Sequence, residues 1–364
     1  MPKCYLCRTE ITEENKSVEH IVPNAIGGRL KSSKILCKDC NSKLGSSMDA
    51  NLAKQLEFFA NQLNVKRERG SAQNIEMKRK STGDVYLVSP EGDLTLRKPL
   101  IEINKSKLGS GIRIRANNIN ELKKTLKGLK RKYPKLNEKE INNLFKDTAE
   151  RITEPLYGTL DFDMGKIYPA VLKMAINYYF DKFGGIDTIA FAIEDMKHDE
   201  LNCVDCVFFE HPLVRTDSEE VFHCIYINGN EKEKKLYAFV ELYSTLQFVV
   251  RLSDDYSGPT LQSLYVFDIL KSKEIKRELN YRLSFDFVFS YNFQMTEYNL
   301  DLFKKKLNRI LQIGAKRRFD CRLSRIMRES FKAAFGEPDG RNITKDDVVP
   351  LVDEMMKRIT PYIG

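Results

Sequence analysis

The spacing of apolar residues after residue 40 predicts a long amphipathic helix near the amino end of the chain. Its apolar side chains recur at steps of three or four, which places them on one helix face: Leu44, Met48, Leu52, Leu56, Phe59 and Leu63. A polar run at 66–71, which contains Gly70, ends the pattern and is typical of a linker. We expect this helix to pack partly on the residues before it and partly on those beyond the linker.

Residues 85–115 show the shorter apolar alternation of β-strands. Segments 85–88 and 94–96 flank a turn sequence that contains Pro90 and Gly92, which predicts a hairpin, and 100–103 and 112–114 continue the strand pattern. Arg113 and Arg115 alternate with isoleucines and therefore project from the opposite face. Contact with phosphates and plain solvent exposure are both open for these two arginines.

Between residues 116 and 200 the apolar period becomes helical. A stripe from Leu122 to Tyr133 is surrounded by basic residues, among them Lys123, Lys124 and Lys127. A basic amphipathic helix can face DNA, an anionic membrane or water, and the lack of an aromatic insertion face argues against the membrane. A wider stripe at 167–183 ends at two glycines, a helix stop, and predicts the core helix of a second domain.

The remainder of the chain is rich first in strands and then in helices. Strands are predicted at 207–209, 221–227, 236–242, 247–252, 264–269 and 283–289, and their short links favour an antiparallel meander. The last 65 residues have helical spacing, with Arg322 and Arg325 on one face. That face is a second candidate nucleic-acid surface, although solvation or pairing with acidic residues explains it equally well.

Composition fits a soluble globular protein of two or three domains. The chain has 364 residues, 42% of them hydrophobic, and a mean hydropathy of −0.43. It contains no run of about 20 apolar residues that could cross a bilayer and no apolar segment typical of a secretory signal. We therefore expect a cytoplasmic location, where cysteine pairs are metal ligands more often than disulfides.

The net charge of +9 is unevenly distributed along the chain. Residues 65–160 and 301–364 are net positive, whereas 161–300 are net negative. A basic segment suits a protein that binds a phosphate backbone, and ordinary clustering on a solvated face is the alternative.

Four cysteines near the amino end form two C-x-x-C pairs, Cys4 with Cys7 and Cys37 with Cys40. This spacing is typical of a tetrahedral structural zinc site, and buried free thiols are the alternative. A third pair, Cys203 and Cys206, has Cys224 and Cys321 as irregularly spaced companions, and zinc binding there is not expected.

Between and after the N-terminal pairs lie Glu19-His20 and, directly after Cys40, Asn41. This combination over residues 1–64 resembles the HNH, or ββα-metal, endonuclease family in its form with a Cys4 zinc site. The resemblance implies that His20 is the general base and that Glu19 and Asn41 hold one catalytic Mg²⁺ or Mn²⁺. The position of the family's middle asparagine is occupied by Ser32. A structural histidine and a helix-capping asparagine are the alternatives. For Asp49, two turns beyond Asn41 and near the same helix face, a role beside the metal ligands or the substrate is open, and solvent exposure is favoured.

These observations predict an α+β protein: a zinc-stapled ββα-metal finger at 1–64, a basic linker, hairpin and helical region at 65–200, and an antiparallel sheet with C-terminal helices at 201–364. The resemblance implies a metal-dependent endonuclease acting on DNA, most simply double-stranded, in a prokaryotic defence, restriction or mobile-element context. The C-terminal region would then choose the target or respond to a small-molecule or protein trigger, and a homodimer would allow two nicks. The alternatives are a non-catalytic zinc-finger module that binds DNA or protein, and a nuclease of structured RNA.

Overall fold

The chain forms two compact units, each built from two separate stretches of sequence. The computed structural model describes residues 2–106, 109–134, 152–197, 201–217, 219–337, 340, 342 and 344–363. Unit 1 comprises Met1–Gln73 and Leu160–Arg317, and unit 2 comprises Asn74–Thr159 and Arg318–Gly364. The division into three consecutive domains at 1–64, 65–200 and 201–364, expected from the sequence, stays a prediction.

The amino end of unit 1 is a small finger of two short strands and a helix. Strand β1 (Glu19–His20) pairs antiparallel with β2 (Lys31–Ser32), and the 3₁₀ turn η1 (Asn24–Ile26) lies between them. Two glycines close the connection after η1. Gly27 has φ +98°, and a Cβ on Gly28 would lie 1.9 Å from the Val22 carbonyl oxygen, so both positions require glycine.

The helix predicted after Cys40 is present, but it is divided into consecutive segments. These are α1 (Lys38–Leu44), the π-helical segment η2 (Gly45–Asp49), α2 (Ala50–Gln55) and α3 (Glu57–Gln62). Its predicted apolar stripe packs into the core, with Leu52, Leu56, Phe59 and Leu63 fully buried. The face predicted from sequence is therefore confirmed over four segments.

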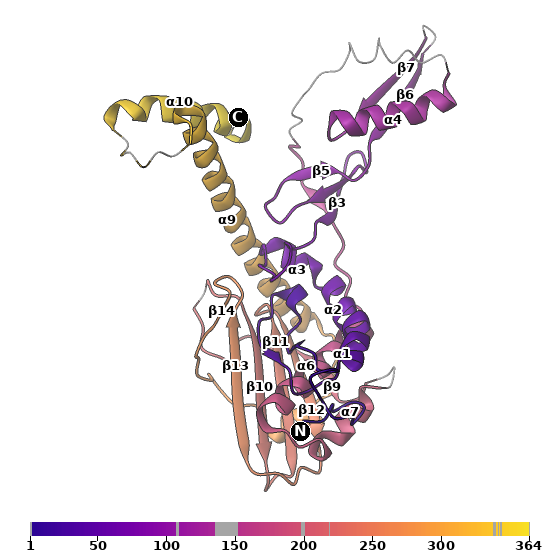
Figure 1. Cartoon of the computed structure of the whole chain (residues 1–364), viewed down its shortest axis with the longest axis vertical. Coiled ribbons are helices and arrows are strands. Elements are labelled where there is room, and N and C mark those ends of the chain that lie inside the picture. The colour runs from indigo at the N-terminus through magenta and orange to yellow at the C-terminus, as the bar shows by residue number, and fades with distance from the viewer. Residues whose placement is uncertain are drawn as a thin grey trace. The chain divides into compact units, whose positions relative to one another are not determined.

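The larger part of unit 1 is a six-stranded antiparallel sheet in the order β14-β13-β10-β11-β12-β9 (Figure 1). The strands are β9 (Val204–Val207), β10 (Phe222–Asn230), β11 (Lys235–Leu242), β12 (Leu246–Ser253), β13 (Leu261–Asp268) and β14 (Lys273–Glu274). The predicted meander holds for β10, β11 and β12. It is wrong for β13, which pairs with β10 along its whole length instead of with β12.

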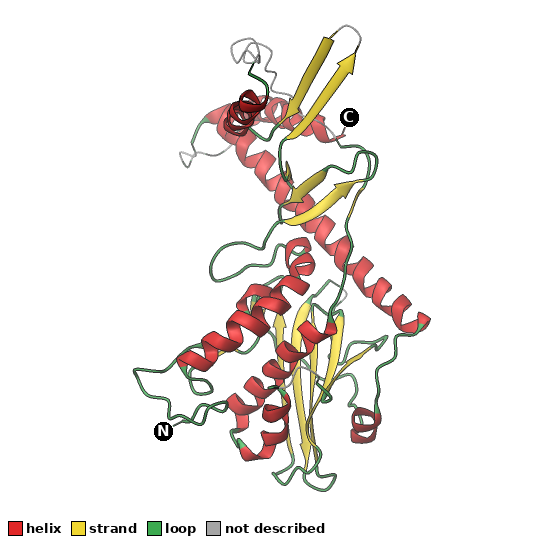
Figure 2. Cartoon of the chain, turned by 90° about the vertical axis from the view of Figure 1, so that its right-hand side faces the viewer, coloured by secondary structure: helices red, strands yellow, loops and turns green. Residues whose placement is uncertain are grey.

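Helix α6 (Met164–Phe183) lies along one face of this sheet (Figure 2). It is joined there by η3 (Asp187–Ile189) and α7 (Ala190–Asp195). Alternate strand residues such as Ile225 and Val240 belong to the same core cluster as α6 and the finger, whereas Tyr226 and Phe239 belong to a cluster on the other face. A buried helix is therefore present where the sequence predicted one, but it belongs to the same compact unit as the finger and not to a second domain.

One predicted strand is a helix. Residues 283–289 alternate apolar and polar side chains, yet α8 (Phe285–Ser290) is helical, with Ser284 as N-cap accepting a hydrogen bond from Phe287 N–H. The cap favours a helix start, and the phenylalanines pack with the second cluster over the sheet. Local capping and tertiary packing therefore outweighed the alternation of apolar and polar residues that predicted a strand.

Unit 2 contains two small sheets and several helices. Strands β3 (Ile75–Arg79), β4 (Val85–Val88), β5 (Leu94–Leu96) and β8 (Leu156–Tyr157) form one sheet in the order β5-β4-β3-β8, and β6 (Leu100–Ser106) pairs with β7 (Gly109–Arg115). The basic helix is α4 (Ile119–Lys132). Helix α9 (Glu297–Phe335) belongs to unit 1 up to Arg317 and to unit 2 from Arg318, and α10 (Lys345–Ile363) belongs to unit 2. Over the part of the chain that the structure describes, no helix has the length and apolar character needed to span a membrane.

These elements confirm the α+β class, with antiparallel sheets, separate helices and a cysteine cluster at the amino end.

Candidate nuclease centre in the N-terminal finger

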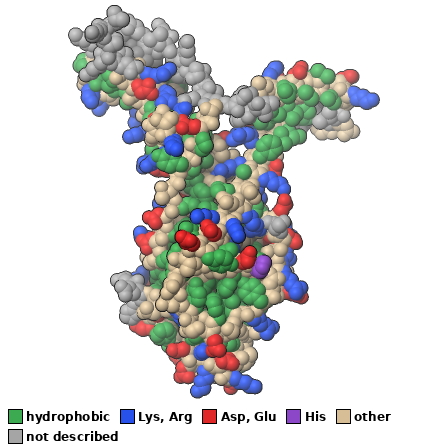
Figure 3. Space-filling model, turned by 180° about the vertical axis from the view of Figure 1, so that it is seen from behind, with side chains coloured by type: hydrophobic (Ala, Val, Ile, Leu, Met, Phe, Trp, Pro, Cys, Tyr) green, Lys and Arg blue, Asp and Glu red, His purple; other side chains and the backbone are tan. Residues whose placement is uncertain are grey.

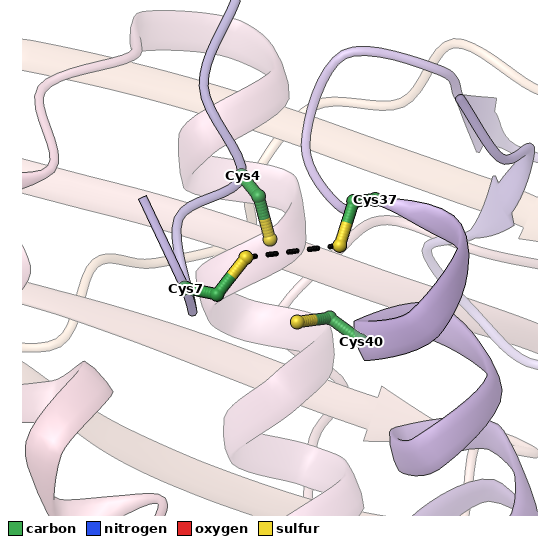
Figure 4. Close-up of side chains that lie close together, drawn as sticks. All are labelled: Cys4, Cys7, Cys37 and Cys40. Carbon is green, nitrogen blue, oxygen red and sulfur yellow. Dashed lines mark hydrogen bonds between the residues drawn. The ribbon is translucent and has the colours of Figure 1, made fainter. Parts of the chain in front are cut away.

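The four N-terminal cysteines converge on one point (Figure 4). Cys4 and Cys7 come from a tight turn, in which Cys4 N–H donates to Thr9 O, and Cys37 and Cys40 lie at the N-cap and in the first turn of α1. All four Sγ atoms lie within 4.8 Å of one another, and those of Cys7 and Cys37 are 3.7 Å apart. Tetrahedral zinc with Zn–S bonds of about 2.3 Å separates its sulfurs by about 3.8 Å. The cluster can therefore hold one zinc ion with little rearrangement.

The other four cysteines do not form such a group. Cys203, Cys206 and Cys224 are buried free thiols, and Cys321 is an exposed one. Among the described residues the N-terminal quartet is the one group of three or more candidate ligands that converges.

Strand β1 separates Glu19 from His20 because successive strand residues point to opposite faces. Glu19 is paired with Ser32 and His20 with Lys31 across the hairpin. The Glu19 side chain is 4% exposed, whereas that of His20 is 25% exposed. The strand therefore directs the acid inward and presents the imidazole at the surface.

The imidazole of His20 lies against a carboxylate that the motif does not contain. His20 Nε2 is 3.2 Å from Glu68 Oε2, and Glu68 Oε1 also pairs with Lys31 Nζ at 2.6 Å. Burial lowers the pKa of His20, and Glu68 opposes that shift only in part. His20 is consequently neutral near pH 7, which is the protonation state that a general base needs.

Glu19 lies in a buried polar network with helix α6. Lys173 Nζ is 2.5 Å from Glu19 Oε1 and 2.7 Å from Asp49 Oδ2, and the Lys173 side chain is 1% exposed. Asn177, one turn along α6, donates to Glu19 Oε1 at 3.0 Å and accepts from the Tyr5 hydroxyl at 2.9 Å. The finger's acidic residue is therefore fixed by two side chains more than 150 residues away in sequence.

Burial raises the pKa of both carboxyls in this network, and the ammonium of Lys173 opposes the shift at each. Because Glu19 and Asp49 share a single lysine, the pair keeps an excess of negative charge when both are ionised. Asp49 Oδ1 is, in addition, buried without a hydrogen-bond partner. Oxygen donors with excess negative charge suit a hard divalent cation such as Mg²⁺ or Mn²⁺. The residues present thus fit the catalytic cation expected for this family.

Asn41 lies beside the start of the same strand. Its amide nitrogen donates to Ser17 Oγ and, at 3.4 Å, to the carbonyl of Val18, the residue before Glu19. With Nδ2 engaged in this way, Oδ1 is the atom left to accept or to ligate a cation. Asn41 is in α1 and is not its N-cap, a position that Cys37 occupies.

Some of the residues predicted to contact nucleic acid form ion pairs within the protein, and others are exposed to solvent. Arg115 pairs with Asp84 and Glu102, and Arg325 makes two hydrogen bonds of 2.8 Å to Asp93. On α4, Leu122, Leu126 and Leu129 are buried, and the three candidate lysines are exposed: Lys123, Lys124 and Lys127. Arg113 is exposed and Arg322 is half-buried.

Basic and acidic side chains alternate over the face of unit 1 drawn in Figure 3, without one continuous basic patch. Lys123, Lys124 and Lys127 on α4 are exposed, whereas Arg115 and Arg325 pair with acidic side chains; phosphate contact by any of them stays a prediction.

Residues 4–57 match the sequence model of a family described as HNH endonuclease. The match includes both cysteine pairs, Glu19, His20 and Asn41. No curated protein and no solved structure matches the chain. The resemblance expected from the motif is thereby confirmed for the finger, and an HNH endonuclease domain indicates nuclease activity in general.

The motif alone did not reveal three of the neighbouring residues. Glu68 lies in the predicted linker and Lys173 in the predicted core helix, where a polar residue within an apolar stripe was the available signal. Asp49 was expected to be solvated. That expectation is wrong, because its carboxylate is paired with a buried lysine.

Proposed function

We propose that the chain is a metal-dependent endonuclease that hydrolyses phosphodiester bonds of double-stranded DNA. The observation that supports this most directly is the neutral, partly exposed His20 next to the buried Glu19, on a strand beside the cysteine quartet. A zinc ion held by four thiolates has no open position and is structural. Cleavage would then depend on the second, oxygen-bound cation.

In this mechanism Glu19 and Asn41 would hold the divalent cation. Such a cation would supply polarisation of the scissile phosphate and stabilisation of the leaving oxygen. His20 takes a proton from the attacking water. Because Nε2 faces the Glu68 carboxylate at 3.2 Å, it keeps its hydrogen, and Nδ1 is the nitrogen left to accept the proton. Glu68 thus holds the ring in its working tautomer.

The remaining residues would control where and when the finger cuts. A finger of this size grips a backbone and gives little sequence preference by itself. We assign backbone binding to the exposed lysines of α4 and target choice, or response to a trigger, to the rest of the chain. Action within a prokaryotic defence, restriction or mobile-element system fits this division of roles.

The test is conversion of supercoiled plasmid to nicked or linear forms by the zinc-loaded full chain. We expect cleavage with Mg²⁺ or Mn²⁺ and none after chelation of those ions under conditions that leave the zinc bound. A structured RNA digested in parallel distinguishes the two polymers. The assay is repeated with methylated and hypermodified DNA. If unmodified DNA, both modified DNAs and the RNA all remain intact although the chain binds DNA, the chain is a binding module and the proposal is wrong.

A further inference from the structure

Asp49 lies at the end of a π-helical segment, where the local geometry departs from the helix on either side. Segment η2 (Gly45–Asp49) separates α1 from α2. A π segment contains an extra residue per turn and so rotates the side chains after it relative to an α-helix. Segments of this kind are frequent at functional sites. Here the segment ends with the Asp49 carboxylate directed toward helix α6, where Lys173 contacts it.

The two oxygens of Asp49 have different surroundings. Oδ2 accepts a hydrogen bond of 2.7 Å from Lys173 Nζ, the same nitrogen that contacts Glu19 Oε1. Oδ1 is buried and has no hydrogen-bond partner. Because one nitrogen touches both carboxylates, Asp49 and Glu19 are immediate neighbours.

A salt bridge alone does not account for this arrangement. A buried carboxylate is normally satisfied at both oxygens, whereas Lys173 satisfies one oxygen of Asp49 and leaves the other. The side chain as a whole is 21% exposed, although Oδ1 itself is buried. A cation bound at Oδ1 would supply the partner that this oxygen lacks, on a carboxylate that Lys173 already holds in place.

We propose that Asp49 is a further oxygen ligand of the divalent cation assigned to Glu19 and Asn41, with Oδ1 as the ligating atom. The inference rests on the proposed nuclease function, since it adds a residue to the same centre. Two carboxylates and one amide form an oxygen donor set with a net negative charge, as Mg²⁺ and Mn²⁺ prefer. Lys173 contacts the opposite oxygen of Asp49 and so prevents the carboxylate from rotating away.

The experiment measures Mn²⁺ binding directly, by loss of the free Mn²⁺ paramagnetic resonance signal on titration into the zinc-loaded full chain. Asp49→Asn retains the shape and an acceptor for Lys173 but removes the ligand charge. We expect its dissociation constant for Mn²⁺ to rise about tenfold or more, with one zinc retained per chain. Asp39→Asn is the matched control, because Asp39 is an exposed acid in the first turn of α1. It should bind Mn²⁺ as the wild type does.

The outcomes separate this inference from the proposed function. If the wild type binds Mn²⁺ and nicks plasmid while Asp49→Asn binds Mn²⁺ equally tightly, the ligand assignment is wrong and the nuclease proposal stands. A wild type that binds no Mn²⁺ also overturns the assignment, and its plasmid cleavage then decides the nuclease proposal separately. If Asp49→Asn loses zinc or cooperative melting, Asp49→Ser, which leaves Lys173 paired with Glu19, is judged by the same affinity criterion.

Discussion

His20 Nε2 lies 3.2 Å from Oε2 of Glu68, a residue 48 positions later in the chain. The pair joins the surface face of β1 to the segment that follows α3, and Lys31 and Arg29 lie beside the same carboxylate. Imidazoles that act as bases or ligands are commonly held by such a partner, which fixes the ring and its tautomer. Here the partner is an acidic side chain outside the Glu-His motif.

Replacing Glu68 by Gln should slow plasmid nicking about tenfold, because loss of the carboxylate weakens control of the His20 ring. The partly exposed position predicts little change in melting temperature. Single-turnover nicking at saturating Mg²⁺ measures the effect. Glu57→Gln is the control, since Glu57 forms only a surface pair with Lys54. Full nicking activity in Glu68→Gln would contradict the orienting role.

Replacing Lys173 by Met should destabilise unit 1 by about 3–5 kcal/mol, because two buried carboxylates lose their common cation. Urea unfolding followed by circular dichroism measures the loss. Lys166→Met, on the same helix, is the control, since Lys166 pairs with the exposed Asp163. Equal stability of the two variants would show that the network does not hold the finger to α6.

The stability of unit 1 should fall as the pH decreases below 6.5, in part because of His223. Burial lowers the pKa of this histidine to about 4, and its Nε2 lies 2.9 Å from the carbonyl of Ile26 in the finger. The unfolded chain therefore binds more protons than the folded chain between pH 6.5 and about 4. The group's contribution, roughly 3 kcal/mol, is fully present above pH 6.5 and is lost as the pH falls through that window.

The measurement is the difference in unfolding free energy between pH 7 and pH 4.5 for the wild type and for His223→Gln. Gln is neutral at both pH values and can still donate to the Ile26 carbonyl. The variant should lose less stability than the wild type on acidification. If both lose the same amount, His223 is not responsible for the pH dependence.

Reversing the charge of Lys123, Lys124 and Lys127 to Glu should weaken DNA binding and reduce its dependence on salt. For each phosphate that the variant no longer binds, the slope of log affinity against log salt concentration should become shallower by about 0.9. Fluorescence anisotropy at several salt concentrations measures both quantities. A control with the same charge change uses three exposed lysines of unit 1, Lys232, Lys234 and Lys276. An unchanged slope in the α4 variant would exclude that helix as a phosphate-binding element.

The finger could be predicted from sequence because its signals are local. Two C-x-x-C pairs and an adjacent Glu-His dipeptide fix ligand types and spacing within about 40 residues. The amphipathic stripes of α3, α4 and α6 were likewise local. They were confirmed because a helix that buries one face has apolar residues at every third or fourth position.

The partners of the site could not be predicted because they depend on tertiary contacts. Nothing in the sequence around Lys173 indicates that its ammonium meets Glu19, and the orientation of Asp49 depends on a π segment that apolar spacing does not encode. The predicted strand order was wrong for a similar reason. The pairing of β13 with β10 is a long-range choice, and the segment containing Phe285 became a helix through its cap and its packing over the sheet.

The central claim, that His20 performs the chemistry of a nuclease, is tested most directly by His20→Ala in a single-turnover nicking assay with Mg²⁺. We predict a rate at least about 100-fold below that of the wild type, with zinc content, melting temperature and DNA affinity unchanged. A variant that keeps its zinc and its fold and nicks DNA at the wild-type rate would contradict the account.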